Sequence, residues 1–288
     1  MKVPSNNLRV VREYYQNLLE PLYGKQESVQ LLLILFKHFF GYDRSQLALQ
    51  PDLKLSESEL LKVHFAVKDL LRHKPIQYIT GESEFMGYGF LVKPGVLIPR
   101  PETEEMVDMI IKRFQNRSPL SIWDLGTGSG CIAVSLALSL PQAKVKAFDL
   151  SEEAISLTKL NAQRLNVDIS LQQTDILELR PTERKKIDVI VSNPPYVRQS
   201  ERHHMQKNVL DFEPDMALFV SDEDPLIFNQ AVANIGDKVL AKDGELWLEI
   251  NEALGKETAA LIENTGFKKV QIHQDFSGRD RFVSAVKN

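Results

Sequence analysis

The strongest constraint on the fold of this chain is the alternation of strand-type and helix-type segments from residue 121 onward. Short apolar runs such as "SIWDLG", "KVKAFDL", "IDVIVS" and "GELWLEI" are separated by segments whose apolar residues recur at helical spacing. Strands and helices that alternate in this way form a mostly parallel sheet with helices on both faces. The closing "KKVQIHQDFSGRDRFVSAVK" predicts two antiparallel strands that turn near Gly278. We therefore predict an α/β fold whose ligands bind beyond the carboxyl ends of the strands.

The first 75 residues have a different pattern, which predicts a small all-helical domain. Apolar residues recur at helical spacing, and "LLLILFKHFF" is apolar almost all round, as in a buried helix. Ser56 and Glu59 have the spacing of a capping box at a helix start. Residues 76–100 hold four glycines among aromatic and polar residues, which predicts a β-hairpin linker. A helix then begins with Pro101 at its first position, and residues 101–288 form the second domain.

A glycine-rich turn, "DLGTGSG", follows the first strand of the second domain. Its glycines let the backbone turn sharply and let a ligand approach closely. Cys131 stands where the dinucleotide fingerprint G-x-G-x-x-G has its third glycine, so the spacing argues against NAD. An acidic residue before the turn would repel a pyrophosphate, but it suits the amino or sulfonium end of S-adenosylmethionine. The predicted cofactor-binding residues here are Asp124, Gly126, Thr127, Gly128, Ser129 and Gly130; a plain strand-to-helix turn is the alternative interpretation.

Two further carboxylates stand at the ends of the next two strands. Asp149 in "AFDLS" can accept two hydrogen bonds from ribose hydroxyls, and the competing role of helix N-cap is available to Ser151. Asp175 in "QQTDIL" can accept a hydrogen bond from an adenine amino group, with Ile176 packing on the ring. Acidic residues at three successive strand ends predict a nucleoside pocket, with S-adenosylmethionine as the cofactor.

The fourth strand ends in "NPPY", Asn193-Pro194-Pro195-Tyr196, whose prolines hold the backbone stiffly. An amide or exocyclic amino nitrogen is a poor nucleophile because its lone pair is delocalised. Acceptors on both of its N–H bonds would increase the electron density on that nitrogen. Asn193 supplies a side-chain carbonyl, Pro194 supplies a backbone carbonyl, and Tyr196 can pack flat against a planar substrate group. We predict that these four residues catalyse transfer to nitrogen through positioning and fixed dipoles, with Asn193 also facing the cofactor. A rigid loop without chemistry is the alternative.

Composition limits the other classes of function. A net charge of −4 and a pI near 5.9 argue against a protein that binds nucleic acid mainly through phosphates. The single cysteine, Cys131, precludes a disulfide within the chain, and "MKVPSNNLRV" lacks the apolar core of a signal peptide. The apolar runs are too short to span a bilayer, so we expect a soluble cytoplasmic protein without a membrane partner. His203 and His204, in the loop that follows "NPPY", lack further ligands at suitable spacing, so no metal is expected.

With these motifs the sequence resembles the HemK/PrmC-type protein-(glutamine-N5) methyltransferases that modify peptide chain release factors. The similar segments, in family order, are "PIQYITGESEFMG", "VLIPRPETEE", "DLGTGSGCIA", "IVSNPPYV", "DFEPDMAL" and "DFSGRDRFV". "NPPY" alone marks the wider class of amino-nitrogen methyltransferases, and "IPRPETE" and "GRDR" narrow the resemblance to this family. It implies a seven-stranded, Rossmann-like class I methyltransferase domain, a hairpin linker and a helical N-terminal domain that helps to dock the release factor. It also implies that the substrate is the glutamine of the Gly-Gly-Gln (GGQ) motif in a class I release factor.

Carried over by position, the resemblance implies that Gly126 to Gly130, Asp149 and Ile176 bind the cofactor and that Asn193 to Tyr196 hold the glutamine side chain. One segment departs from the family. After "GELWLEI" the family usually has a glycine and soon a glutamine, whereas this chain has Asn251-Glu252-Ala253-Leu254-Gly255.

Three other functions remain open at this point. A DNA or RNA amino-methyltransferase would use the same "NPPY" chemistry, and a nicotinamide-dependent oxidoreductase would use the glycine-rich turn. A non-catalytic binding module would leave the "NPPY" segment without a role. For the leading function we expect a monomer that makes no direct contact with nucleic acid.

Overall fold

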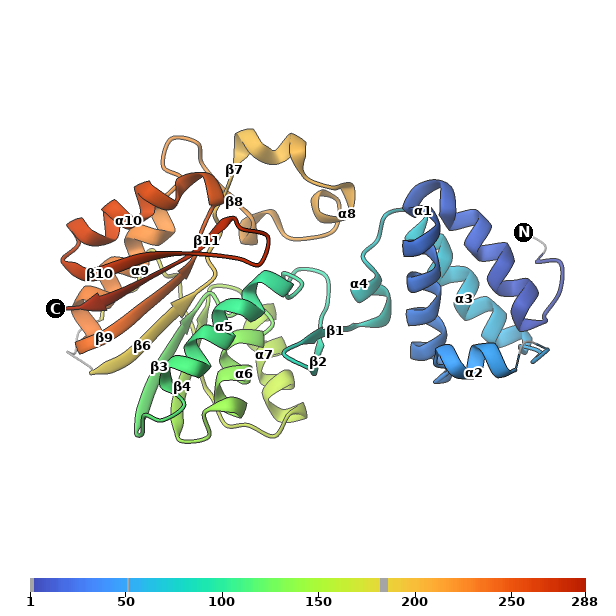
Figure 1. Ribbon diagram of the computed structural model, residues 1–288, viewed down its shortest axis with the longest axis horizontal. Helices are drawn as coiled ribbons and strands as arrows, with labels where there is room; N and C mark the ends of the chain where they lie inside the picture. The colour runs from blue at the N-terminus through green and yellow to red at the C-terminus, as the bar shows by residue number, and fades with distance from the viewer. Residues whose placement is uncertain (1–2, 51, 182–185) are drawn as a thin grey trace. The chain divides into compact units, whose positions relative to one another are not determined.

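The computed structural model describes residues 3–50, 52–181 and 186–288, which form two compact units (Figure 1). The first unit comprises the residues up to Gly81 together with 206–212, and the second comprises 82–205 and 213–288. All predicted cofactor-binding and catalytic residues belong to the second unit. In the described part of the chain, no helix is long and apolar enough to cross a membrane.

The first unit is helical, as the spacing of its apolar residues predicted. Its helices are α1 (Leu8–Phe40), α2 (Arg44–Leu49), α3 (Glu57–Leu70), α4 (Ile76–Thr80) and α8 (Lys207–Leu210). Helix α1 is interrupted at Gly24, where φ is 72° and ψ is 168°. The capping box of α3 is confirmed, because Ser56 Oγ accepts from the N–H of Glu59 and the carboxylate of Glu59 accepts from the N–H of Ser56.

The segment "LLLILFKHFF" is buried on one side only. Leu31, Leu32, Leu35 and Phe36 lie in the core of the first unit, whereas Ile34 is 42% exposed. The predicted buried helix of a small bundle is therefore confirmed for these four residues, whereas its other side is exposed. A helix in a small bundle has neighbours on one side, and the apolar residues of its other side stay at the surface.

Residues 76–100 contain a short helix as well as the predicted hairpin. The helix is α4, which ends at Gly81 with φ of 74°. The hairpin strands, β1 (Glu82–Phe85) and β2 (Tyr88–Leu91), pair antiparallel. Their turn residues, Met86 and Gly87, both have positive φ, as a type I′ turn requires. The sequence did not indicate α4 because five residues contain little more than one helical turn.

The second unit is built on a seven-stranded sheet with the order β10-β11-β9-β6-β3-β4-β5. The strands are β3 (Leu120–Leu125), β4 (Ala143–Asp149), β5 (Ser170–Gln173), β6 (Ile187–Ser192), β9 (Leu240–Glu249), β10 (Phe267–Gln274) and β11 (Asp280–Lys287). Strand β11 is antiparallel to both β9 and β10, and the other neighbours are parallel. This confirms the predicted mostly parallel sheet with an antiparallel pair at its C-terminal end.

Helices cover both faces of this sheet (Figure 1). They are α5 (Pro101–Phe114), α6 (Cys131–Ser139), α7 (Glu152–Arg164), α9 (Ile227–Val239) and α10 (Gly255–Asn264). Helix α5 begins at Pro101, as predicted. Along β3, Ile122 joins the core beneath α5 and α6, whereas Trp123 and Leu125 join the opposite core beneath α9 and α10. Alternate side chains of a strand face opposite ways, so each strand supplies both cores.

The segment between β6 and α9 contains more regular structure than the loop expected from the sequence. Two short strands, β7 (Val197–Arg198) and β8 (Phe219–Val220), pair parallel, and 3-10 helices span Gln199–His204 and Asp215–Ala217. Glu213, which is buried, accepts a hydrogen bond of 3.1 Å from the N–H of Ile98 and forms an ion pair of 2.6 Å with Arg100. These bonds hold the later part of the segment against the residues that precede α5.

Candidate active site

A cavity of about 380 Å³ lies at the carboxyl ends of β3, β4 and β6. The predicted site residues that line it are Gly126, Thr127, Gly128, Ser129, Asp149, Asp175, Ile176, Asn193 and Pro195. Among the described residues, four other predicted ones lie outside this lining: Asp124, Gly130, Pro194 and Tyr196. The structure thus brings the glycine-rich turn, the two later carboxylates and the asparagine of "NPPY" to one cavity. The remaining wall includes Arg100 and Phe228, which the sequence did not single out.

Four backbone N–H groups of the glycine-rich turn donate hydrogen bonds to acceptors within the protein. The N–H groups of Gly126 and Thr127 both donate to the carbonyl of Phe148 at 2.9 Å, and that of Gly128 donates to Asp149 Oδ2 at 2.8 Å. The N–H of Gly130 donates to the carbonyl of Thr127 at 2.8 Å. A pyrophosphate site needs such groups to point at the ligand. The turn is therefore poorly suited to a dinucleotide, which argues against the oxidoreductase alternative.

Glycine is required in this turn because of its backbone conformation. Gly126, Gly128 and Gly130 have φ of 79°, 58° and 81°, in the left-handed region that other residues rarely adopt. At Gly126 a Cβ would lie 3.7 Å from Cδ1 of Ile176, an ordinary contact distance. The requirement for glycine at this position therefore comes from the backbone conformation, and Gly126 and Ile176 both line the cavity.

Asp124 lies beneath the glycine-rich turn and is fully buried. Its Oδ2 accepts a hydrogen bond of 2.7 Å from the hydroxyl of Thr127, whereas its Oδ1 accepts no hydrogen bond of good geometry from the described residues. Burial raises the pKa of Asp124 to about 7, against the opposing effects of the Thr127 hydroxyl and of the nearby N–H of Ala133. A carboxylate held in this way is stabilised by a cationic group nearby.

Asp149 and Asp175 differ in how the chain holds them. Asp149 ends β4, and its Oδ1 accepts from the N–H of Ser151 at 2.9 Å while its Oδ2 accepts from Gly128. Ser151 caps α7 through a bond from the N–H of Ala154, so Asp149 is not the cap. Asp175 lies two residues beyond the end of β5, and its Oδ1 accepts from the N–H of Leu177 at 2.8 Å. Both carboxylates are fixed by backbone donors and face the cavity.

Asn193 follows the last residue of β6, and its amide contacts a residue that the sequence did not single out. Its Nδ2 donates a hydrogen bond of 3.1 Å to Oγ1 of Thr103, in the first turn of α5. The hydroxyl of Thr103 donates to Oε2 of Glu249 at 2.7 Å. Pro195 lines the cavity beside Asn193. The orientation of the Asn193 amide therefore depends on a buried residue of another element.

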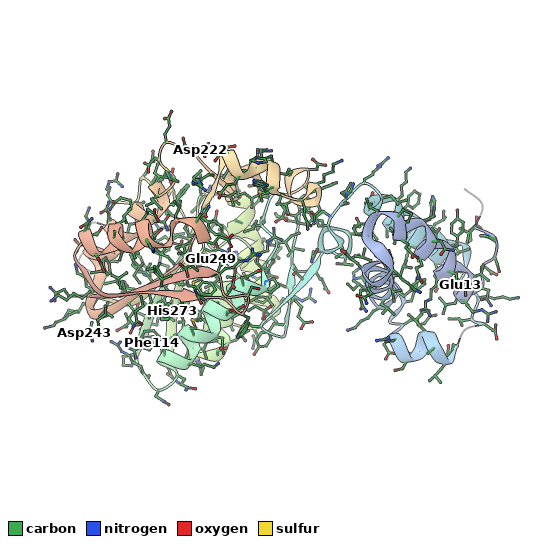
Figure 2. All side chains as sticks on the ribbon, turned by 45° about the horizontal axis from the view of Figure 1, so that its top comes forward. Glu13, Phe114, Asp222, Asp243, Glu249 and His273 are labelled. Carbon is green, nitrogen blue, oxygen red and sulfur yellow. The ribbon has the colours of Figure 1, made fainter. Side chains whose placement is uncertain are left out.

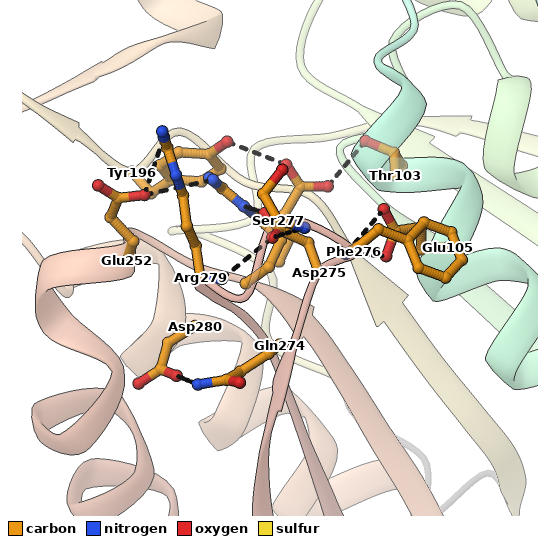
Figure 3. Close-up of polar contacts among 12 residues, drawn as sticks. Thr103, Glu105, Tyr196, Glu252, Gln274, Asp275, Phe276, Ser277, Arg279 and Asp280 are labelled. Atoms are coloured by element: carbon orange, nitrogen blue, oxygen red, sulfur yellow. Dashed lines mark hydrogen bonds and ion pairs between the residues drawn. The ribbon is translucent and has the colours of Figure 1, made fainter.

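Tyr196 is held by its hydroxyl, which donates to Oε1 of Glu249 at 2.9 Å; Figure 3 shows Tyr196 and Thr103 on either side of the carboxylate that they share. Burial raises the pKa of Tyr196, and the charge of Glu249 raises it further, so the hydroxyl keeps its proton. Burial also raises the pKa of Glu249, which the hydroxyls of Thr103 and Tyr196 and the charge of Arg281 lower. The only sequence signal for Glu249 is an acidic residue near the end of the apolar run "GELWLEI".

The two adjacent histidines and the cysteine considered in the sequence analysis do not take part in these hydrogen bonds. The rings of His203 and His204 lie 3.8 Å apart, and no group of three or more His, Cys, Asp or Glu in the described ranges could hold a metal ion. Cys131 lines the cavity, but burial raises the pKa of its thiol to about 12. A thiol with that pKa is not a nucleophile at neutral pH.

Comparison with known proteins finds two family models that match parts of this chain. Residues 89–211 match the family "Methyltransferase small domain", and residues 16–81 match "PrmC N-terminal domain". Solved structures with a similar fold include the 16S rRNA methyltransferase RsmC of T. thermophilus, with a TM-score of 0.54, 20% identity and coverage of 72% of this chain and 50% of that one. Another is a methyltransferase from Pyrococcus furiosus, with a TM-score of 0.52, 15% identity and coverage of 81% and 100%. These two likenesses concern the fold alone.

Two curated relatives match over almost their whole length. The release factor glutamine methyltransferase of Bacteroides thetaiotaomicron is 39% identical over 275 residues, which are 96% of this chain and 98% of the relative. That of Flavobacterium psychrophilum is 42% identical over 275 residues, 94% of this chain and 96% of the relative. The chain is therefore an enzyme of the release factor glutamine methyltransferase family, with the fold of a class I methyltransferase domain and a PrmC-type helical N-terminal domain.

Proposed function

We propose that this enzyme transfers a methyl group from S-adenosylmethionine to the side-chain amide nitrogen, N5, of the glutamine in the GGQ motif of class I release factors. One observation carries the proposal most directly. Asn193 lines the same cavity as the glycine-rich turn and Asp149. An acceptor for an amide N–H and the residues suited to a nucleoside thus share one space.

The cavity suits S-adenosylmethionine in three respects. Asp149 would accept hydrogen bonds from the ribose hydroxyls, and Asp175 with Ile176 would hold the adenine. Asp124 lies beneath the turn, outside the cavity lining, and its charge would favour the amino or sulfonium end of the cofactor. When bound, the cofactor supplies an electrophilic methyl group. Because these N–H groups of the turn already donate hydrogen bonds within the protein, the turn suits a ligand without phosphates.

The chain's own contribution to the reaction would be positioning. Oδ1 of Asn193 and the backbone carbonyl of Pro194 would accept hydrogen bonds from the two N–H groups of the glutamine amide. These bonds would increase the electron density on the nitrogen and fix its orientation in the cavity. Tyr196 and Pro195 would limit the movement of the planar amide. Preorganised acceptors of this kind need no reorganisation during the reaction, and no residue has to remove a proton first.

We assign the remaining parts of the chain on the same basis. Residues 1–75 would help to bind the release factor, residues 76–100 would link the domains, and residues 101–288 would carry the methyl transfer. We expect the enzyme to act as a cytoplasmic monomer without direct contact to nucleic acid. Its net charge of −4 supports a protein substrate over a polyphosphate one.

Mass spectrometry tests this proposal directly. The enzyme is incubated with S-adenosylmethionine and unmodified release factor, and the tryptic peptide that contains GGQ is analysed. We expect a gain of one methyl group on the glutamine, with no gain when the enzyme carries Asn193→Ala. Calorimetry measures binding of the cofactor in parallel. Cofactor binding without methylation of the peptide would refute the substrate, and a gel shift with DNA and RNA over a salt series would then test the nucleic-acid alternative.

A further inference from the structure

A buried carboxylate connects the asparagine and the tyrosine of the "NPPY" segment. Glu249 accepts hydrogen bonds from the hydroxyls of Thr103 and Tyr196, one on each carboxylate oxygen. Thr103 in turn accepts the bond from Nδ2 of Asn193. Thr103 is 2% exposed and Glu249 is 1% exposed, so water does not compete for these bonds. The four side chains form one continuous chain of hydrogen bonds.

The direction of each hydrogen bond in this series follows from which groups can donate a proton. An ionised carboxylate only accepts, and a hydroxyl has one proton. The hydroxyl of Thr103 gives its proton to Glu249 and can offer only lone pairs to Asn193. The amide of Asn193 must therefore turn its NH2 group towards Thr103, which directs Oδ1 away from Thr103. An acceptor of amide hydrogens needs that orientation.

The sheet fixes the distance between the two ends of this arrangement. Ser192 of β6 pairs with Leu248 of β9 in a parallel register, so Asn193 and Glu249 are the next residues along these adjacent strands. Thr103 reaches the same place from the first turn of α5. Glu249, labelled in Figure 2, is the last residue of β9 and is buried. Three elements with little freedom to move hold the chain of hydrogen bonds.

A second set of residues supports the tyrosine and the carboxylate. The backbone carbonyl of Tyr196 accepts a hydrogen bond of 3.1 Å from Nδ2 of Asn251, one of the residues at which this chain departs from its family. Arg281 lies close enough to Glu249 and Tyr196 for its charge to lower the pKa of both. Asp275 accepts from Nε of Arg281 at 3.1 Å. Asp275, in the turn after β10, and Arg281, in β11 and in the "GRDR" segment, thus support the site from outside the cavity.

We propose that Thr103 and Glu249 are positioning residues that set the direction in which the Asn193 amide faces the substrate nitrogen. The inference rests on the proposed function, because that function needs Oδ1 of Asn193 as an acceptor and the inference explains how Oδ1 is oriented. Neither residue touches the substrate in this account. Both act through Asn193 and Tyr196.

The test compares Thr103→Val with Thr103→Ser. Valine keeps the shape of threonine but removes the acceptor of the Asn193 NH2 group, so the amide is free to rotate. We expect kcat for methylation of the release factor to fall roughly 10- to 100-fold, since a small misplacement of a reacting group costs this much. Serine retains the hydroxyl and should restore most of kcat. The Kd of S-adenosylmethionine and the KM of the release factor should stay within about threefold of wild type in both variants, because only the reaction step is affected.

Thr258→Val provides a matched control. Thr258, on α10, is also buried, and its hydroxyl donates to the carbonyl of Leu254 at 2.8 Å. Loss of the Thr258 hydroxyl should lower the free energy of unfolding about as much as loss of the Thr103 hydroxyl does, and it should leave kcat unchanged. Equal losses of kcat in Thr103→Val and Thr258→Val would mean that Thr103 is merely structural, and would overturn the inference.

A second readout does not depend on methyl transfer. The side-chain amide signal of Asn193 in a ¹⁵N-labelled protein is identified by its disappearance in Asn193→Asp. We expect one of its protons to exchange slowly with D2O in wild type and in Thr103→Ser, and rapidly in Thr103→Val. Equally rapid exchange in all three would refute the inference. The wild-type enzyme could show the slowly exchanging proton and yet fail to methylate the release factor. That result would refute the proposed substrate but would leave the inferred hydrogen bonds in place.

Discussion

Gly128 and Asp149 are joined by a hydrogen bond of 2.8 Å from the backbone N–H of one to Oδ2 of the other. The bond links the turn after β3 to the end of β4, at the edge of the cavity. Asp149 thus shapes the glycine-rich turn at the same time as it faces the cavity. The carboxylate therefore has a structural role, and the proposed function adds a second role in binding the cofactor.

We predict that Asp149→Ala weakens the binding of S-adenosylmethionine. The variant loses the acceptor of the Gly128 N–H and the proposed partner of the ribose hydroxyls. Hydrogen bonds to charged groups contribute about 1.5–3 kcal/mol each, so the Kd should rise roughly 10- to 100-fold. Calorimetry measures the Kd, and Asp168→Ala, at an exposed position of the same domain, serves as control. An Asp149→Ala protein with the wild-type Kd would show that Asp149 does not hold the cofactor.

A change at Asn193 should affect the reaction and spare the cofactor. We expect Asn193→Ala to lower turnover at least about 100-fold, as the loss of one preorganised polar group at a reacting centre typically does. Asn193→Asp should also be poorly active, because it places a second acceptor against Oγ1 of Thr103, whose proton is already bonded to Glu249. Single-turnover assays at saturating S-adenosylmethionine measure the rate, and the melting temperature with cofactor reports binding. Wild-type turnover in Asn193→Ala would disprove the assigned role.

Gly130 should be intolerant of alanine for steric as well as backbone reasons. A Cβ there would lie 2.6 Å from Cγ2 of Thr158, and the φ of 81° adds about 1–2 kcal/mol of strain. Gly278→Ala is the matched control, because its φ of 78° gives the same strain with no atom within 4 Å of the added Cβ. We expect Gly130→Ala to lose the larger free energy of unfolding, by about 1–3 kcal/mol, the usual cost of overpacking.

Relief of the overlap tests the cause of that difference. Thr158→Ser removes Cγ2 and retains the hydroxyl that donates to the carbonyl of Gly128. Combined with Gly130→Ala, it should recover part of the lost stability. Both tryptophans, Trp123 and Trp247, belong to the second unit, so their fluorescence during urea unfolding reports on it alone. No recovery in the double variant would exclude the contact with Thr158 as the cause.

Asp124 should make the stability of the second unit depend on pH. Its pKa is about 7 in the folded chain and has an ordinary value of 3.8, so the folded state holds its proton more tightly than the unfolded state. Between pH 4 and about 7 the stability of the wild type should fall as the pH rises, by up to about 1.4 kcal/mol per pH unit from this group. An asparagine side chain does not titrate in this range, so the Asp124→Asn variant should lose this dependence.

The comparison of Asp124→Asn with wild type isolates that group from other carboxylates. Urea unfolding followed by tryptophan fluorescence at several pH values from about 5 to 8 gives the two free energies. The free energy of unfolding of Asp124→Asn minus that of wild type should increase as the pH rises to about 7 and then stay constant. Parallel curves for the two proteins would show that Asp124 has an ordinary pKa in the folded state.

Much of the fold could be predicted because its signals are local. The period of the apolar residues distinguishes strand from helix, Ser56 and Pro101 mark helix starts, and Gly278 marks the last turn. The short helix α4 and the exposed side of the segment around Ile34 could not be predicted in this way. Five residues give too little periodicity, and burial depends on which neighbours the helix finds.

In the candidate site, the positions of Asp149, Asn193 and the glycine-rich turn at strand ends could be predicted from the sequence alone. A parallel sheet brings the carboxyl ends of adjacent strands to one edge, so residues at those ends meet whatever the details of packing. The hydrogen bond between Thr103 and Glu249, which lie 146 residues apart in the chain, is evident only in the folded protein. That contact depends on the register of β6 against β9 and on the position of α5 over the sheet, neither of which has a signal in any short stretch of sequence.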